Sequence, residues 1–153
     1  MGVNMGIWDD YKEDLTEREG PAAEEIFITL FGEAWQHDTP NAKLFTDLYN
    51  WYTSGAEDGM YQFFEFEPRT EESLAELGAV IEKYFPAEAY AVFQRSVNEL
   101  MPLVYADEPD DEAIDALSVE IDDYFNEHQT ELLHSIKEYL LAEGDSIAEE
   151  IGW

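Results

Sequence analysis

The chain has 153 residues and carries 37 Asp and Glu against 7 Lys and Arg, so its formal net charge is -30. At 45% hydrophobic residues it is too apolar for a disordered acidic tail, and we expect one domain over residues 1–153. The composition excludes disulfides and thiolate metal sites, because there is no cysteine, and the charge repels nucleic acid and anionic membranes.

Apolar residues at helical spacing predict helices along almost the whole chain. The N-terminal stretch lacks the basic start of a signal peptide, and no apolar run is long enough for a membrane span. The first helix runs from Ile7 past Leu15, and the second follows Gly20-Pro21 and reaches Trp35. Later helices are expected over residues 42–52, 71–85, 86–101, 110–126 and 130–143. Expected helix ends are Ser54-Gly55, Pro102 and Gly144, because glycine favours C-termini and proline lacks a donor.

Residues 59–66 hold five aromatic or large apolar side chains, and their short length does not separate a strand from a buried helix. Thr70 and Asp110 are good N-caps for the helices that follow them. The sequence therefore predicts an all-α fold, as a single compact domain of seven or eight helices. The core is expected to contain Phe31, Trp35, Phe63, Phe64, Leu77, Phe93, Phe125 and Leu133.

Catalytic and metal-binding motifs are sparse. Glu131 and His134 have the Glu-x-x-His spacing of di-iron bundles, but such sites need a second copy and two more glutamates. His37 and His128 are interpreted, like His134, as surface histidines. The acids around Asp107 lack the glycine and closing glutamate of a calcium loop. We expect no enzyme activity, no cofactor and no specific metal.

The acidic surface has three interpretations. It is a solvated shell adapted to high salt, a mimic of DNA, or the surface of an inhibitor or immunity protein that plugs the basic cleft of a nuclease or toxin. A duplex segment of about 40 Å carries roughly 24 negative charges, which is comparable to the charge of this chain. Helices also arrange carboxylates in rows, since residues three and four apart are neighbours. The expected partner-binding residues on the last two long helices are Asp111, Glu112, Asp115, Glu120, Asp122, Asp123, Glu127, Glu131 and Glu138.

The segment Glu57–Phe66, EDGMYQFFEF, resembles the motif Asn-Gly-Gly-Phe-x-Gln-Phe-Phe-x-Asn of an acidic, all-α bacterial family. In that family the domain forms the C-terminal part of a double-stranded-DNA mimic protein. Five residues match, and Glu57, Asp58, Met60 and Phe66 depart from the pattern; the matches are Gly59, Tyr61, Gln62, Phe63 and Phe64. Later stretches extend the resemblance over about residues 42–143. It implies an α-helical fold, a homodimer as a common state, and sequestration of a helix-turn-helix repressor.

These observations together predict a non-enzymatic, cytoplasmic DNA mimic that occupies the DNA-binding surface of a basic protein. The partner is a basic DNA-binding protein or a nuclease, and direct binding to nucleic acid or membranes is not expected. The alternatives of an inhibitor or immunity protein and of salt adaptation stay open. A mimic is displaced by duplex DNA from several basic partners, whereas an immunity protein binds one partner tightly.

Overall fold

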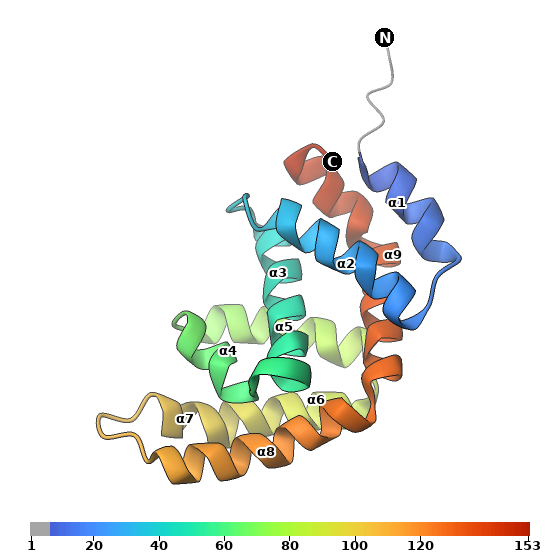
Figure 1. The fold of residues 1–153 in the computed structure, drawn as a ribbon. Helices are drawn as coiled ribbons and strands as arrows, with labels where there is room; N and C mark the ends of the chain where they lie inside the picture. The colour runs from blue at the N-terminus through green and yellow to red at the C-terminus, as the bar shows by residue number, and fades with distance from the viewer. Residues whose placement is uncertain (1–6) are drawn as a thin grey trace.

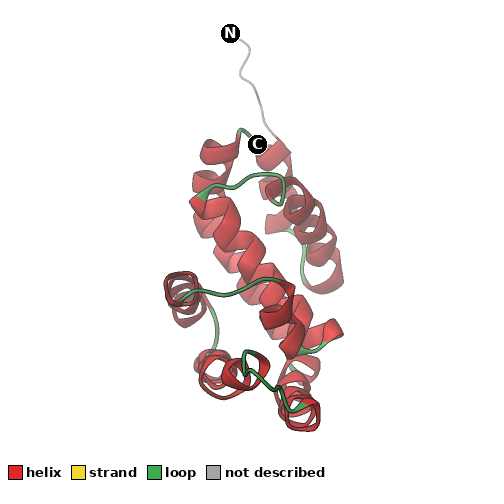
Figure 2. Cartoon of the chain, turned by 90° about the vertical axis from the view of Figure 1, so that its left-hand side faces the viewer, coloured by secondary structure: helices red, strands yellow, loops and turns green. Residues whose placement is uncertain are grey.

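The computed structural model describes residues 7–153, and within that range the chain is all-α without a strand (Figures 1 and 2). The helices are α1 (Ile7–Thr16), α2 (Gly20–Ala34), α3 (Pro40–Thr53), α4 (Met60–Phe66), α5 (Glu71–Tyr84), α6 (Ala87–Arg95), α7 (Met101–Val104), α8 (Asp111–Glu127) and α9 (Gln129–Ile151). Two π-helical turns, η1 (Ser54–Asp58) and η2 (Ser96–Leu100), extend α3 and join α6 to α7. The described residues thus form eight continuous helical segments, and the predicted fold class is confirmed. Residues 1–6, on which part of the signal-peptide prediction rests, lie outside the described range.

Helix α9 connects the two ends of the molecule. Figure 1 shows α8 running beside α6 and α7, while α9 leaves that direction and rises past α2. Helices α1, α2, α3 and α5 all contact α9, whereas α4, η1 and η2 contact α8. The buried side chains form one hydrophobic cluster that takes members from every long helix. Within residues 7–153, no helix combines the length and apolar character needed to cross a bilayer.

Most of the predicted core is buried, and two members are not. Six of the eight predicted residues are buried: Phe63, Phe64, Leu77, Phe93, Phe125 and Leu133. Phe31 is only half-buried, and the prediction for Trp35 is wrong because its side chain is 45% exposed. Ala34 takes the core position at the end of α2 with 0% exposure. Since each helical residue is rotated by about 100°, Trp35 is turned off the buried stripe.

Two predicted helix starts are confirmed at the level of hydrogen bonds. The Thr70 hydroxyl accepts from the Ser73 N–H at 3.1 Å, and the Ser73 hydroxyl in turn accepts from the Thr70 N–H. The Asp110 carboxylate accepts from the Ala113 N–H at 3.2 Å. The ambiguous stretch 59–66 is the short helix α4, with Met60, Phe63 and Phe64 buried.

Two predicted helix ends, Pro102 and Gly144, are wrong. The third, Ser54-Gly55, is confirmed only as the end of α-helical bonding, because α3 ends at Thr53 and the chain continues as η1. Gly55 and Gly144 lie inside helical segments, where a Cβ atom would overlap the rings of Phe125 and Trp8 respectively. These glycines permit close packing between segments, and α9 ends instead at Gly152 with φ of 78°. Pro102 lies in α7, directly after the π-helical turn whose last bond runs from the Met101 N–H to the Ser96 carbonyl. The register changes there, so the missing proline donor does not end the helix.

Candidate functional site

Helix α8 turns most of its carboxylates to solvent. Its buried side consists of Ile114, Ser118, Ile121, Tyr124 and Phe125, which follow helical spacing. Six of its acidic residues are exposed: Asp111, Glu112, Asp115, Glu120, Asp123 and Glu127. The apolar residues therefore fix the orientation of the helix, and the acids take the remaining positions because solvation favours them there.

Five of these exposed residues form no ion pair with any described residue, and we call them the α8 acidic face: Asp111, Glu112, Asp115, Asp123 and Glu127. Glu120 differs, because its carboxylate lies 2.9 Å from the Arg95 guanidinium. At a rise of about 1.5 Å per residue, the face extends over roughly 24 Å. Its first members lie in the first turn of α8, where the helix dipole also favours negative charge.

Asp122 does not belong to this face, so the expectation that it points outward is wrong. Its carboxylate accepts from the Met60 N–H at 2.9 Å, and the neighbouring Ser118 hydroxyl accepts from the Tyr61 N–H at 3.3 Å. These α8 side chains therefore cap the N-terminus of α4. Burial raises the pKa of Asp122 to about 6, although the donors from Met60 and Ser118 act in the opposite direction.

The predicted acids of α9 do not continue the α8 row in a straight line (Figure 1). Glu131 and Glu138 are both exposed, but α9 leaves the direction of α8 (Figure 1). Glu138 lies 3.2 Å from His134 Nε2, and Glu19 lies 3.1 Å from His134 Nδ1. His134 is thus a surface histidine among acids, as the sequence indicated. The two sets of carboxylates do not form one straight row.

Every lysine and arginine of the chain lies within 4 Å of a carboxylate. The pairs are Lys12–Asp145, Arg18–Asp14, Lys43–Asp47, Arg69–Asp47, Lys83–Glu143, Arg95–Glu120 and Lys137–Glu19. Only Arg95 reaches α8. The cations are thus neutralised within the molecule, and the α8 acidic face keeps its negative charge.

A buried ion-pair cluster was missed in the sequence. The Arg69 guanidinium donates to Asp47 at 2.9 Å, to Glu67 at 2.8 Å and to the Phe63 carbonyl at 2.8 Å. It also lies 3.8 Å from the centroid of the Phe63 ring, and Lys43 contacts both carboxylates. The sequence does contain one sign of this cluster, because Asp47 is a charged residue among the apolar residues of the stretch 45–52. Because these charges balance locally, the cluster is structural and offers no free charge to a partner.

Other acids stabilise the fold at long range. Glu150, near the end of α9, accepts from the backbone N–H groups of Asn41 and Ala42 and thereby caps α3. Burial acts to raise the pKa of Glu150, but these donors outweigh it and the pKa lies below its ordinary value. Asp145 accepts from the Trp8 indole at 2.7 Å and from Lys12, and these bonds lower its pKa.

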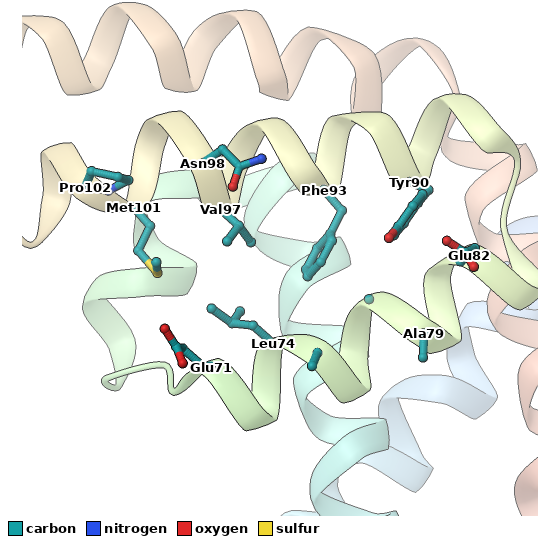
Figure 3. Close-up of a pocket in the computed structure, with 12 residues that line it drawn as sticks. Glu71, Leu74, Ala79, Glu82, Tyr90, Phe93, Val97, Asn98, Met101 and Pro102 are labelled. Atoms are coloured by element: carbon teal, nitrogen blue, oxygen red, sulfur yellow. The ribbon is translucent and has the colours of Figure 1, made fainter.

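A groove of about 670 Å³ lies between α5 and the rod formed by α6, η2 and α7. Figure 3 shows Leu74, Phe93 and Val97 inside it, with Glu71 and Glu82 toward opposite ends. The residues that line it include no histidine, serine, threonine, lysine or arginine. Among residues 7–153, no three His, Asp or Glu side chains come together as a metal site. Glu71, Glu82 and Tyr90 are the ionisable side chains that line the groove.

In comparisons with protein-family models, curated proteins and solved structures, nothing matched the chain. The resemblance of residues 57–66 to the DNA-mimic family therefore stays a prediction.

Proposed function

We propose that this protein is a non-enzymatic DNA mimic of the cytoplasm, whose α8 acidic face occupies the DNA-binding surface of a basic protein. A helix-turn-helix repressor is the expected kind of partner. The observation that supports this most is the charge distribution. Each cation is paired inside the molecule, while five carboxylates on one helix have no cationic partner.

The spacing of charge on α8 resembles that of one DNA strand. The α8 acidic face holds five carboxylates over its length of roughly 24 Å, because Glu120 is paired with Arg95 and Asp122 caps α4. One strand of a duplex carries one phosphate per 3.4 Å, so a length of about 24 Å carries roughly seven phosphates. A basic groove-binding surface of this length would therefore meet a similar linear charge on α8. Such complementarity raises association rates and makes them sensitive to salt.

The test is the release of a labelled DNA duplex from purified helix-turn-helix domains. The wild type should release the duplex at low salt and lose this ability as salt rises. The variant Asp111→Asn/Asp115→Asn/Asp123→Asn/Glu127→Gln should release it less well, with at least about a tenfold weaker effect, because several phosphate-like contacts are removed together. Asp122 is left unchanged because it caps α4.

A control with the same change of net charge is available on α1 and directly after it. The substitutions Asp9→Asn, Asp10→Asn, Glu13→Gln and Glu17→Gln alter four exposed acids that form no ion pair with described residues. If net charge alone drives release, this control will weaken release as much as the α8 variant, and the proposed face is wrong. If the wild type does not release the duplex at low salt, mimicry is wrong. Tight binding to one nuclease that duplex DNA does not displace would favour the inhibitor alternative.

A further inference from the structure

Aromatic side chains lie exposed on a face formed by α2 and the end of α4. The side chains of Trp35 and Phe66 are 45% and 57% exposed, and their ring centroids lie 5.5 Å apart. The half-buried Phe31 stacks on Trp35 at 5.6 Å. Ile28, two turns earlier on α2, is 57% exposed. We call Ile28, Phe31, Trp35 and Phe66 the aromatic patch. Exposed aromatic clusters of this kind mark interaction sites in soluble proteins.

The patch is hollowed and continuous with two smaller depressions. Phe31, Gly32, Trp35, Asn50 and Phe66 line a hollow of about 400 Å³, which has room for a large apolar side chain. A second hollow, of about 220 Å³, shares Trp35, and a third, of about 160 Å³, shares Phe66. The rings therefore form the walls of a recess and not a flat surface.

Two unpaired carboxylates flank this recess. Asp38 lines the hollow beside Trp35, and Asp58 lines the hollow beside Phe66. Both side chains are exposed, and neither forms an ion pair with a described residue. The nearby cations, Lys43 and Arg69, are held by Asp47 and Glu67.

We propose that the aromatic patch binds a segment of a basic protein that inserts one large apolar side chain between the rings and places Arg or Lys beside the acids. The rings supply an apolar recess for the anchor, and arginine also stacks on aromatic faces. This site lies on α2 and α4, apart from the α8 acidic face, and does not depend on the function proposed for α8. A second copy of the chain is disfavoured because both copies carry a charge of -30.

The test uses short synthetic peptides that are rich in Arg and Lys and contain no Trp. Each carries one anchor residue, Leu or Phe, at its centre. Partner peptides have Ala in place of the anchor, or Gln in place of the basic residues. Tryptophan fluorescence reports binding, because Trp35 is the most exposed of the four tryptophans: Trp8 and Trp51 are buried at 2% and 0% exposure, and Trp153 is half-buried. The basic anchored peptide should shift the emission to the blue and bind about tenfold more tightly than either partner peptide.

Variants separate the patch from general charge attraction. Phe66→Ser should weaken the anchored peptide by about tenfold and leave the Ala peptide unchanged. The matched control is Val119→Ser, which removes an apolar side chain that is 58% exposed on α8. The α8 variant described above should retain the preference for the anchor, so failure of either site is seen separately.

Three outcomes would overturn the proposal. The first is equal binding of the basic peptides with and without the anchor. The second is an anchor preference that survives Phe66→Ser, which would place the anchor elsewhere. The third is a wild-type dimer in sedimentation that Phe66→Ser converts to a monomer, because the patch would then bind a second copy.

Discussion

Individual carboxylates in this chain differ in role: some cap a helix N-terminus, and others remain in solvent. Asp122 and Glu150 accept hydrogen bonds from the first backbone N–H groups of α4 and α3, where no local side chain does so. Asp111 and Asp115, by contrast, make no such contact and remain in solvent. Acids that resemble each other in sequence thus differ in energetic role, because only some of them face an uncapped helix end.

Substitution of Asp122 by Asn and by Ala should have opposite effects on the free energy of unfolding. Asp122→Asn keeps an acceptor for the Met60 N–H and removes a partly desolvated charge, so at pH 7 we expect a free energy of unfolding up to about 1 kcal/mol above that of the wild type. Asp122→Ala removes the acceptor and should be less stable than the Asn variant by about 1–2 kcal/mol. Urea unfolding at neutral and acidic pH measures both.

The pH dependence of this effect has a definite sign. The folded pKa of Asp122 is about 6 and its ordinary value is 3.8, so the folded state holds a proton that the unfolded state releases between these values. Stability of the wild type is therefore lost as pH rises through this window. The advantage of Asp122→Asn should be largest at pH 7 and disappear near pH 4. An equal advantage at both pH values would contradict the assigned desolvation.

At the scale of helices, close contacts at glycine determine how α1 meets α9. The Trp8 ring packs against Gly144 in the middle of α9, and its indole donates to Asp145. The same arrangement occurs where the Phe125 ring of α8 covers Gly55 of η1. These glycines permit two segments to approach without changing the helical backbone.

Gly144→Ala should destabilise the protein, although alanine is the better helix former. A Cβ atom would overlap the Trp8 ring, and displacement of α1 should cost about 1–3 kcal/mol. Gly32→Ala is the matched control, because nothing lies within 4 Å of a Cβ there, and it should stabilise by about 0.5–1 kcal/mol. Chemical denaturation of both variants measures the difference. Similar stabilisation by both would show that α1 does not pack on Gly144.

For the whole molecule, repulsion within the acidic shell should dominate the response to solvent. All lysines and arginines are paired, so the formal charge of -30 is carried by the remaining carboxylates. We expect the melting temperature to rise between low salt and about 1 M sodium chloride, because salt screens this repulsion. The experiment should use a chloride salt and not a sulfate salt, because sulfate also strengthens the burial of apolar surface in any protein.

The melting temperature should also pass through a maximum near pH 5. From pH 7 downward, protonation of Asp122 stabilises the folded state. Below about pH 4.5 the trend reverses, because Glu19, Asp145 and Glu150 have lowered pKa values and their contribution is lost as they protonate. Thermal melts followed by circular dichroism test this. A curve that is independent of both salt and pH would contradict a self-repelling shell.

Local pattern alone determined much of this protein. Helical periodicity gave the all-α class, since burying an amphipathic stripe needs only the spacing of residues such as Leu77 and Phe125. The N-caps at Thr70 and Asp110 were also predictable, because the donor they satisfy lies three residues away. The exposed acids of α8 followed from the same periodicity.

Tertiary structure alone decided the features that depend on distant partners. Asp122 meets Met60 across 62 residues, and Trp8 meets Asp145 across 137 residues. No periodicity within one helix reveals such contacts, so Asp122 was assigned to the surface and Gly144 to a helix end. Trp35 was likewise assigned to the core, because apolar character alone does not show whether another element covers a side chain. Packing between helices decides which acids and aromatic rings remain free for a partner.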